Sequence, residues 1–65
     1  MYNCKLINEA INRIVVFKLY EPNIVVVETS SKDGDFFSVL QTVATEHDKA
    51  DAMKEEYLKE GFTEV

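Results

Sequence analysis

The chain has 65 residues, of which 46% are hydrophobic and 29% charged, and its formal net charge at pH 7 is -5. This length suits one domain, and the apolar fraction is too high for an intrinsically disordered acidic tail. All of the net charge lies in residues 31–65, so the surface repels phosphate backbones and anionic membranes and favours a protein partner over direct nucleic-acid binding.

The first two segments predict a strand and a turn. Residues 2–7 alternate loosely between apolar and polar side chains, which is typical of a short strand with one buried face. Cys4 lies on the apolar side and is expected to act as a small buried hydrophobic residue. Residues 8–12 contain two asparagines and a glutamate, so we expect a turn or a single helical turn there.

Two apolar runs then predict a hairpin. Residues 13–21 are rich in β-branched and aromatic side chains, and both faces of the strand they predict are substantially apolar. Pro22 and Asn23 interrupt this pattern with residues that favour turns, and the apolar run resumes over residues 24–29. We expect the two runs to pair as antiparallel strands.

A second hairpin is predicted around Asp33 and Gly34. Residues 30–35 are polar, and an Asp-Gly dipeptide is favoured at the centre of tight primed turns because both central positions need a positive φ. The returning strand is expected to span residues 36–44. Simple alternation divides it into two faces, one of which carries Phe37, Val39 and Val43.

The last segment predicts a helix. Thr45 suits an N-cap, and the acidic residues after it favour the positive end of a helix. The side chains that recur at helical spacing, and so predict the face on the sheet, are Ala50, Met53, Tyr57 and Gly61. Gly61 supplies the left-handed residue that ends a helix, so we expect Phe62 and Val65 to return to the core as a short tail or an edge strand.

These segments predict one domain over residues 1–65 of the α+β class. Four antiparallel strands form a small sheet, and one C-terminal helix packs on one of its faces, in the order ββββα. A chain of this length buries only about 60% of its unfolded surface, so dense packing or self-association must supply stability.

The order of these elements resembles that of WGR domains. The likeness is carried by NRIVVF at residues 12–17, VAT at residues 43–45, and KEGF at residues 59–62, where those domains typically end a helix in Lys-Lys-Gly-Tyr. The Trp-Gly-Arg motif is absent, because the third strand continues as VETSS. WGR domains are associated with nucleic-acid contact, so the resemblance implies a degenerate nucleic-acid-binding module. Its positive charges for contact with nucleic acid would come from Lys5, Arg13 and Lys18.

Few side chains in this chain are suited to catalysis. Cys4 is the only cysteine and His47 the only histidine, so neither a disulfide nor a Cys/His zinc site can form within one chain. We expect His47 to be exposed on the first helical turn, and Asp33 and Asp35 belong to a loop too short for a calcium site. The sequence therefore predicts a protein that is not an enzyme and that binds no metal or cofactor.

Localisation follows from three further features. No apolar run approaches the roughly 18 residues of a membrane span, and residues 1–7 lack the basic start and long apolar stretch of a secretory signal. A lone thiol suits a reducing compartment. We expect a cytoplasmic protein with no membrane partner.

Protein binding is the function that remains, and two surfaces are predicted for it. The first is acidic and would contact a partner through Asp33, Asp35, Asp48, Asp51, Glu55 and Glu56. This surface suits an inhibitor or nucleic-acid mimic of the accessory or phage type, directed at a nucleic-acid-handling protein. We expect the helix carboxylates to be partly neutralised by two pairs, Asp51 with Lys54 and Glu55 with Lys59. The second is the uncovered sheet, with edge or dimer contacts at Ile14, Val16, Tyr20, Ile24 and Val26, and it predicts a homodimeric structural accessory protein as the alternative.

Overall fold

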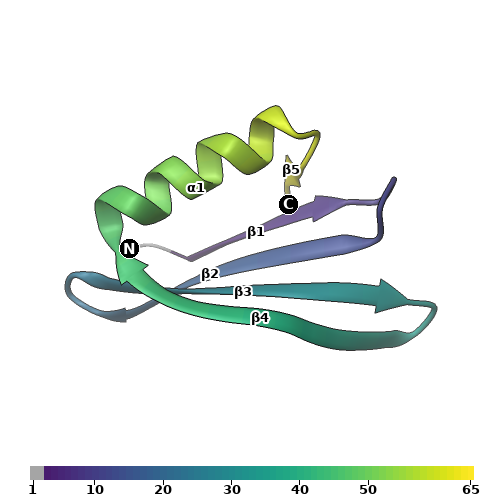
Figure 1. Cartoon of the computed structure of the whole chain (residues 1–65), viewed down its shortest axis with the longest axis horizontal. Helices are drawn as coiled ribbons and strands as arrows, with labels where there is room; N and C mark the ends of the chain where they lie inside the picture. Colours follow the sequence, from purple (N-terminus) through teal and green to yellow (C-terminus); the bar gives the residue numbers. More distant parts are fainter. Residues whose placement is uncertain (1–2) are drawn as a thin grey trace.

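A computed structural model describes residues 3–65, which form one antiparallel sheet with a helix along one side (Figure 1). The strands are β1 (Asn3–Asn8), β2 (Arg13–Glu21), β3 (Ile24–Asp33), β4 (Phe36–Glu46) and β5 (Thr63–Glu64), and helix α1 spans His47–Lys59. The predicted α+β class is confirmed, and a fifth strand is added to the predicted four. Tyr2, which the sequence places at the start of the first strand, lies outside the described residues.

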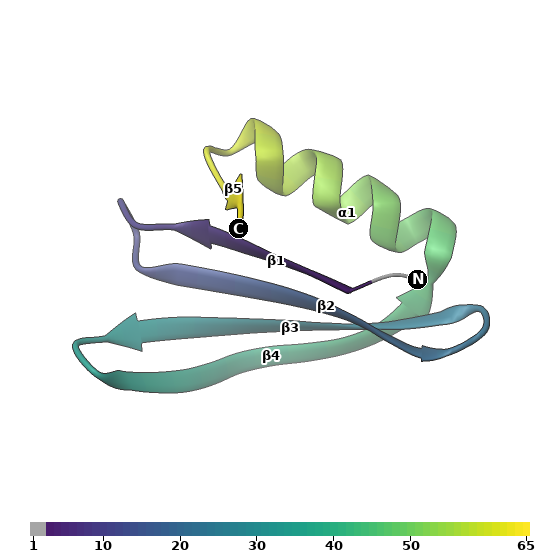
Figure 2. The same ribbon diagram turned by 180° about the vertical axis from the view of Figure 1, so that it is seen from behind.

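The sheet order is β4-β3-β2-β1-β5, so the first four strands form successive hairpins and the fifth lies at the far edge. Helix α1 carries the chain from the end of β4 back towards β1, as both views show (Figure 2). β5 then pairs with β1 at Leu6 and Ile7, and the backbone N–H of Val65 donates to the Lys5 carbonyl at 2.9 Å. Of the two predicted alternatives after Gly61, a tail or an edge strand, the structure therefore has the edge strand.

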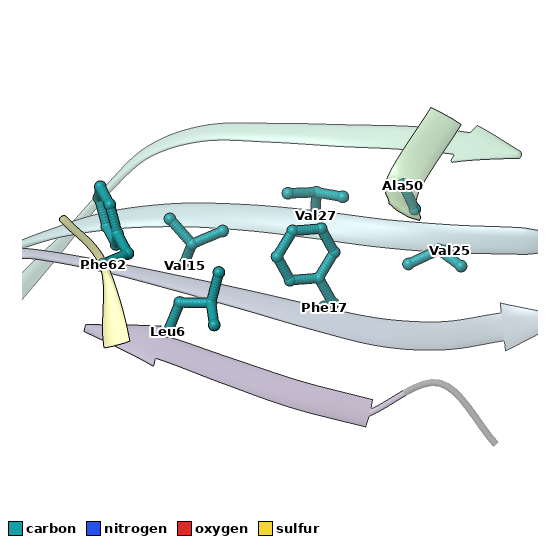
Figure 3. Close-up of a cluster of buried hydrophobic side chains, with 7 residues drawn as sticks. All are labelled: Leu6, Val15, Phe17, Val25, Val27, Ala50 and Phe62. Atoms are coloured by element: carbon teal, nitrogen blue, oxygen red, sulfur yellow. The ribbon is translucent and has the colours of Figure 1, made fainter. Parts of the chain in front are cut away.

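The core lies between the sheet and α1 (Figure 3). Its buried side chains come from β1, β2, β3, α1 and the loop after α1: Leu6, Val15, Phe17, Val25, Val27, Ala50 and Phe62. Tyr57 joins the helix to this cluster through edge-on aromatic contacts, with its ring centroid 6.4 Å from that of Phe17 and 5.0 Å from that of Phe62. Contacts of this kind add about 0.5–1.5 kcal/mol beyond the area they bury, so they fix α1 against β2.

The face and the C-terminal end of α1 agree with the sequence. Ala50 is fully buried, and Met53 and Tyr57 are half-buried against the core. Gly61 follows the helix with φ of 100°, a conformation that residues with a Cβ rarely adopt, and it turns Phe62 into the core.

The predicted start of α1 is wrong. Thr45 is not an N-cap, because the β3–β4 ladder continues through Val25 opposite Thr45 to Ile24 opposite Glu46. Glu46 is the N-cap residue instead and makes no side-chain capping hydrogen bond. His47 is therefore the first helical residue, and it is half-buried rather than exposed.

The predicted loop between β3 and β4 is also shorter than expected. β3 continues to Asp33, which pairs with Phe36, so the turn consists of Gly34 and Asp35 and is not centred on Asp33 and Gly34. Gly34 has φ of 63° and Asp35 does not have a positive φ. A positive φ at the first central position alone is the requirement of a type II′ turn, which glycine meets without steric cost.

A β-bulge changes which side chains of β4 share a face. Thr29 pairs with Gln41 but Ser30 pairs with Val39, so Leu40 is an extra residue on β4. Val43 pairs with the core residue Val27 and faces α1, whereas Val39 lies on the opposite face. The predicted grouping of Phe37 and Val39 with Val43 is therefore wrong, because simple alternation does not allow for the extra residue.

Candidate functional site

β4 forms a free edge of the sheet and carries little of the usual protection against further pairing. Its residues 36–45 read FFSVLQTVAT and contain no charged residue and no proline. Natural edge strands commonly use lysine, proline, bulges or a covering element to prevent another chain from pairing with them. Here the protection is limited to the bulge at Leu40, and in both views the β3–β4 turn, where β4 begins, lies away from α1, which starts where β4 ends.

Large apolar side chains gather on the first half of this edge. The exposed fractions are 77% for Phe36, 59% for Phe37, 58% for Val39 and 53% for Leu40. A buried phenylalanine covers about 150–250 Å², so the two phenylalanines alone expose roughly 200–340 Å². This area is divided between the two faces of the sheet, because Phe36 and Phe37 are adjacent strand residues, so it leaves exposed apolar surface on both sides of β4.

These apolar side chains lie on both faces of the sheet. Phe37 pairs with Lys32 and shares with Val39 the face away from α1, while Phe36 follows the turn on the opposite face. A strand added to this edge would therefore meet apolar side chains above and below the sheet. We name the residues from Phe36 to Thr45, with their free backbone edge, the β4 edge.

The charges around the β4 edge are mainly negative. The β3–β4 hairpin, residues 24–46, holds one basic residue, Lys32, and four acidic residues, Glu28, Asp33, Asp35 and Glu46. Residues 3–21, which form β1 and β2, hold three basic and two acidic residues. The free edge therefore belongs to the negative side of the sheet.

The structure divides the predicted acidic surface between two ends of the molecule. All six predicted carboxylates are exposed. Asp33 and Asp35 lie at the β3–β4 turn, whereas Asp48 lies at the start of α1, at the other end of a molecule 35 Å long (Figures 1 and 2). These residues therefore cannot form one compact contact surface.

On the helix itself the carboxylates divide again. At about 100° per residue, Asp48, Asp51 and Glu55 share one flank and Glu56 falls on another. Lys54 makes its salt bridge with Glu64, at 3.1 Å from ammonium nitrogen to Oε1, and not with Asp51, although the charge of Asp51 also helps to raise the pKa of Lys54. The predicted pair of Glu55 with Lys59 is likewise not formed, and the flank keeps its negative charge.

The predicted contacts on the sheet are less accessible than expected. Ile14 is only 6% exposed because Ile7 and Ser30 lie directly beside it on the neighbouring strands, and Val16, Ile24 and Val26 are half-buried. Tyr20 alone is largely exposed, at 72%. Sequence reasoning did not name the four apolar side chains of the β4 edge as a contact surface, although the uncharged run after the Asp-Gly turn was the signal for one.

The remaining polar groups do not gather into a catalytic arrangement. Burial raises the pKa of the Cys4 thiol, and the charged groups near it are Lys54 and Glu64. A hollow of about 470 Å³ near the β3–β4 turn is lined by Glu9, Arg13 and Lys32 together with asparagine and isoleucine side chains. Within residues 3–65 no three His, Cys, Asp or Glu side chains stand close enough to hold a metal ion.

The cationic residues are dispersed as well. Lys5 pairs with Val16 and Lys18 pairs with Asn3, so both lysines lie on the face away from α1. Arg13 is two residues before Val15 on β2 and therefore lies on the opposite face, the one that α1 covers. The structure therefore does not bring together the three residues proposed for nucleic-acid contact. The described helix is too short and too polar to cross a membrane.

Comparison with known proteins adds no relative. No protein-family model, no curated protein and no solved structure matches this chain. The resemblance to WGR domains therefore stays a prediction.

Proposed function

We propose that this chain is a cytoplasmic, non-enzymatic interaction protein that binds another protein through the β4 edge. The observation that supports the proposal is a free strand edge, residues 36–45, that has no charge and no proline and exposes four large apolar side chains. An edge of this kind offers unpaired backbone groups for hydrogen bonds and apolar side chains for contact, which is the chemistry of β-strand addition.

The experiment is a comparison of partner capture by matched variants. Phe37→Lys and Val39→Lys place charges on the β4 edge, and Tyr20→Lys places the same charge at a residue that is 72% exposed on another strand. We expect the two edge variants to lose proteins that the wild type and Tyr20→Lys both retain from the native host. Circular dichroism checks that each variant is folded. Retention of every captured protein by both edge variants would contradict the proposal.

A second candidate function rests on the flank of α1. Asp48, Asp51 and Glu55 are exposed and unpaired within residues 3–65, so they present a row of negative charge that a basic groove could accept. This arrangement supports an inhibitor or nucleic-acid mimic. Replacing all three with their amides should weaken binding to such a partner with a loss that shrinks at high salt. Unchanged binding would contradict this second function and leave the first intact.

A further inference from the structure

The β4 edge is bordered by carboxylates at both of its ends, and this arrangement restricts what can pair with it. Resting on the proposed function, we propose that the occupant is an extended, largely apolar segment of a partner protein with lysine or arginine at each end. At the turn, Asp33 and Asp35 are both exposed and outnumber Lys32. Beyond the other end, Glu46 and Asp48 are exposed and outnumber Lys49.

The spacing of these charges sets the length of the segment. A strand rises about 3.2–3.4 Å per residue, so a partner that spans residues 36–45 is about ten residues long and reaches both acidic ends. Residues 36–45 carry no charge, so charged side chains in the middle of the partner segment would find no opposite charge there. Removing such side chains from water would cost free energy. Apolar side chains in the middle and cations at both ends therefore match this surface.

A second copy of the chain fits the same edge poorly. Antiparallel pairing of β4 with β4 over residues 36–45 would place Phe36 opposite Thr45, so the turn of each copy, with Asp33 and Asp35, would come close to Glu46 and Asp48 of the other. Symmetry repeats this approach of like charges at the other end of the interface. Like charges brought close together repel each other, and each copy already carries a net charge of -5. A partner with basic ends replaces each repulsion with an attraction.

The test uses two synthetic peptides of alternating valine and threonine, one with two lysines at each end and one with two glutamates. Binding is measured by NMR titration of the full chain at low and high salt. We expect the lysine peptide to bind about tenfold more tightly at low salt, to shift the amide signals of residues 36–45, and to lose this advantage at high salt. Val39→Lys should abolish its binding, whereas Asp35→Asn with Glu46→Gln should remove its preference over the glutamate peptide.

The outcomes separate the two proposals. If both peptides bind the β4 edge equally well, the inference about basic ends is overturned and the proposed function stands. If neither binds and light scattering shows a dimer that Val39→Lys disperses, a second copy is the occupant and the inference is again overturned. If neither binds and the chain is a monomer whose host partners are unaffected by Val39→Lys, the proposed function fails as well.

Discussion

Replacing Gly61 with alanine should destabilise the fold more than the same change at Gly34. Gly61 has φ of 100°, outside the left-handed region near +57°, whereas Gly34 has φ of 63°, inside it. A Cβ at Gly61 would lie 3.6 Å from Asn8 Nδ2, which is an ordinary contact, and a Cβ at Gly34 would meet nothing within 4 Å. Backbone strain, and not a clash, therefore sets both costs.

The two costs can be estimated from these angles. A residue with a Cβ in the left-handed region costs about 1–2 kcal/mol, and the less populated conformation of Gly61 brings that substitution to about 2–3 kcal/mol. A domain of this length has roughly 3–10 kcal/mol of total stability, and each kcal/mol lowers Tm by about 4–8 °C. We therefore expect Gly61→Ala to lower Tm by about 10–20 °C and Gly34→Ala by roughly half as much.

Thermal and urea unfolding followed by circular dichroism measure both changes. Gly61→Asn serves as a third variant, because asparagine tolerates positive φ better than alanine and should recover part of the loss. Equal losses at Gly61 and Gly34, or a larger loss at Gly34, would refute the reasoning that strain after α1 controls the docking of Phe62.

Three further predictions concern the core and the titrating groups. Phe17 is fully buried, so Phe17→Ala should cost about 3–5 kcal/mol in urea unfolding, and a loss below about 1 kcal/mol would show that it is not central to the core. Lys54→Met should cost less than about 1 kcal/mol at pH 7, because the paired side chains are 27% and 48% exposed. The hydrogen bond to Glu64 raises the pKa of Lys54 above its ordinary value of 10.5. The stabilisation is therefore complete below pH 10.5 and is lost as the pH rises through the folded pKa, where the stabilities of wild type and variant should converge. A difference in stability that widens in this range would contradict the assignment. Burial raises the pKa of the Cys4 thiol, so iodoacetamide at pH 9 should alkylate the folded chain more slowly than the urea-unfolded chain, and equal rates would contradict its burial.

The elements that could be predicted are those whose residues act locally. A few neighbouring residues are enough to predict the apolar runs of β2 and β3, the turn at Pro22 and the helical stripe from Ala50 to Tyr57. All of these are present in the structure. Gly61 ends the helix as expected because its role depends on its own backbone angle.

The features that could not be predicted depend on pairing between distant residues. The register between Ile24 and Glu46 keeps Thr45 in a strand, and the bulge at Leu40 moves Val43 to the other face from Val39. Neither effect is visible in alternation along one strand. The pairing of Lys54 with Glu64 likewise requires β5 to return beside β1, and it competes with the neighbour on the helix that local spacing favours.

In the candidate site, too, local features could be predicted and features that depend on distant pairing could not. Exposure of the acidic residues was predictable from their charge, but their separation to opposite ends of the molecule was not. The aromatic pair Phe36 and Phe37 looks in the sequence like core material. It is exposed because β4 lies at the margin of the sheet and α1 leads away from it, and only the strand order reveals this.

The unequal margins of the sheet also bear on stoichiometry. β5 occupies one margin beside Leu6 and Ile7, and β4 leaves the other open. β5 is only two residues long, so its own edge offers little backbone to a further strand, and a sheet with one long free edge is expected to take up one neighbour and not to extend to a third molecule. Complexes built on it are therefore expected to stop at one-to-one composition instead of growing into fibres.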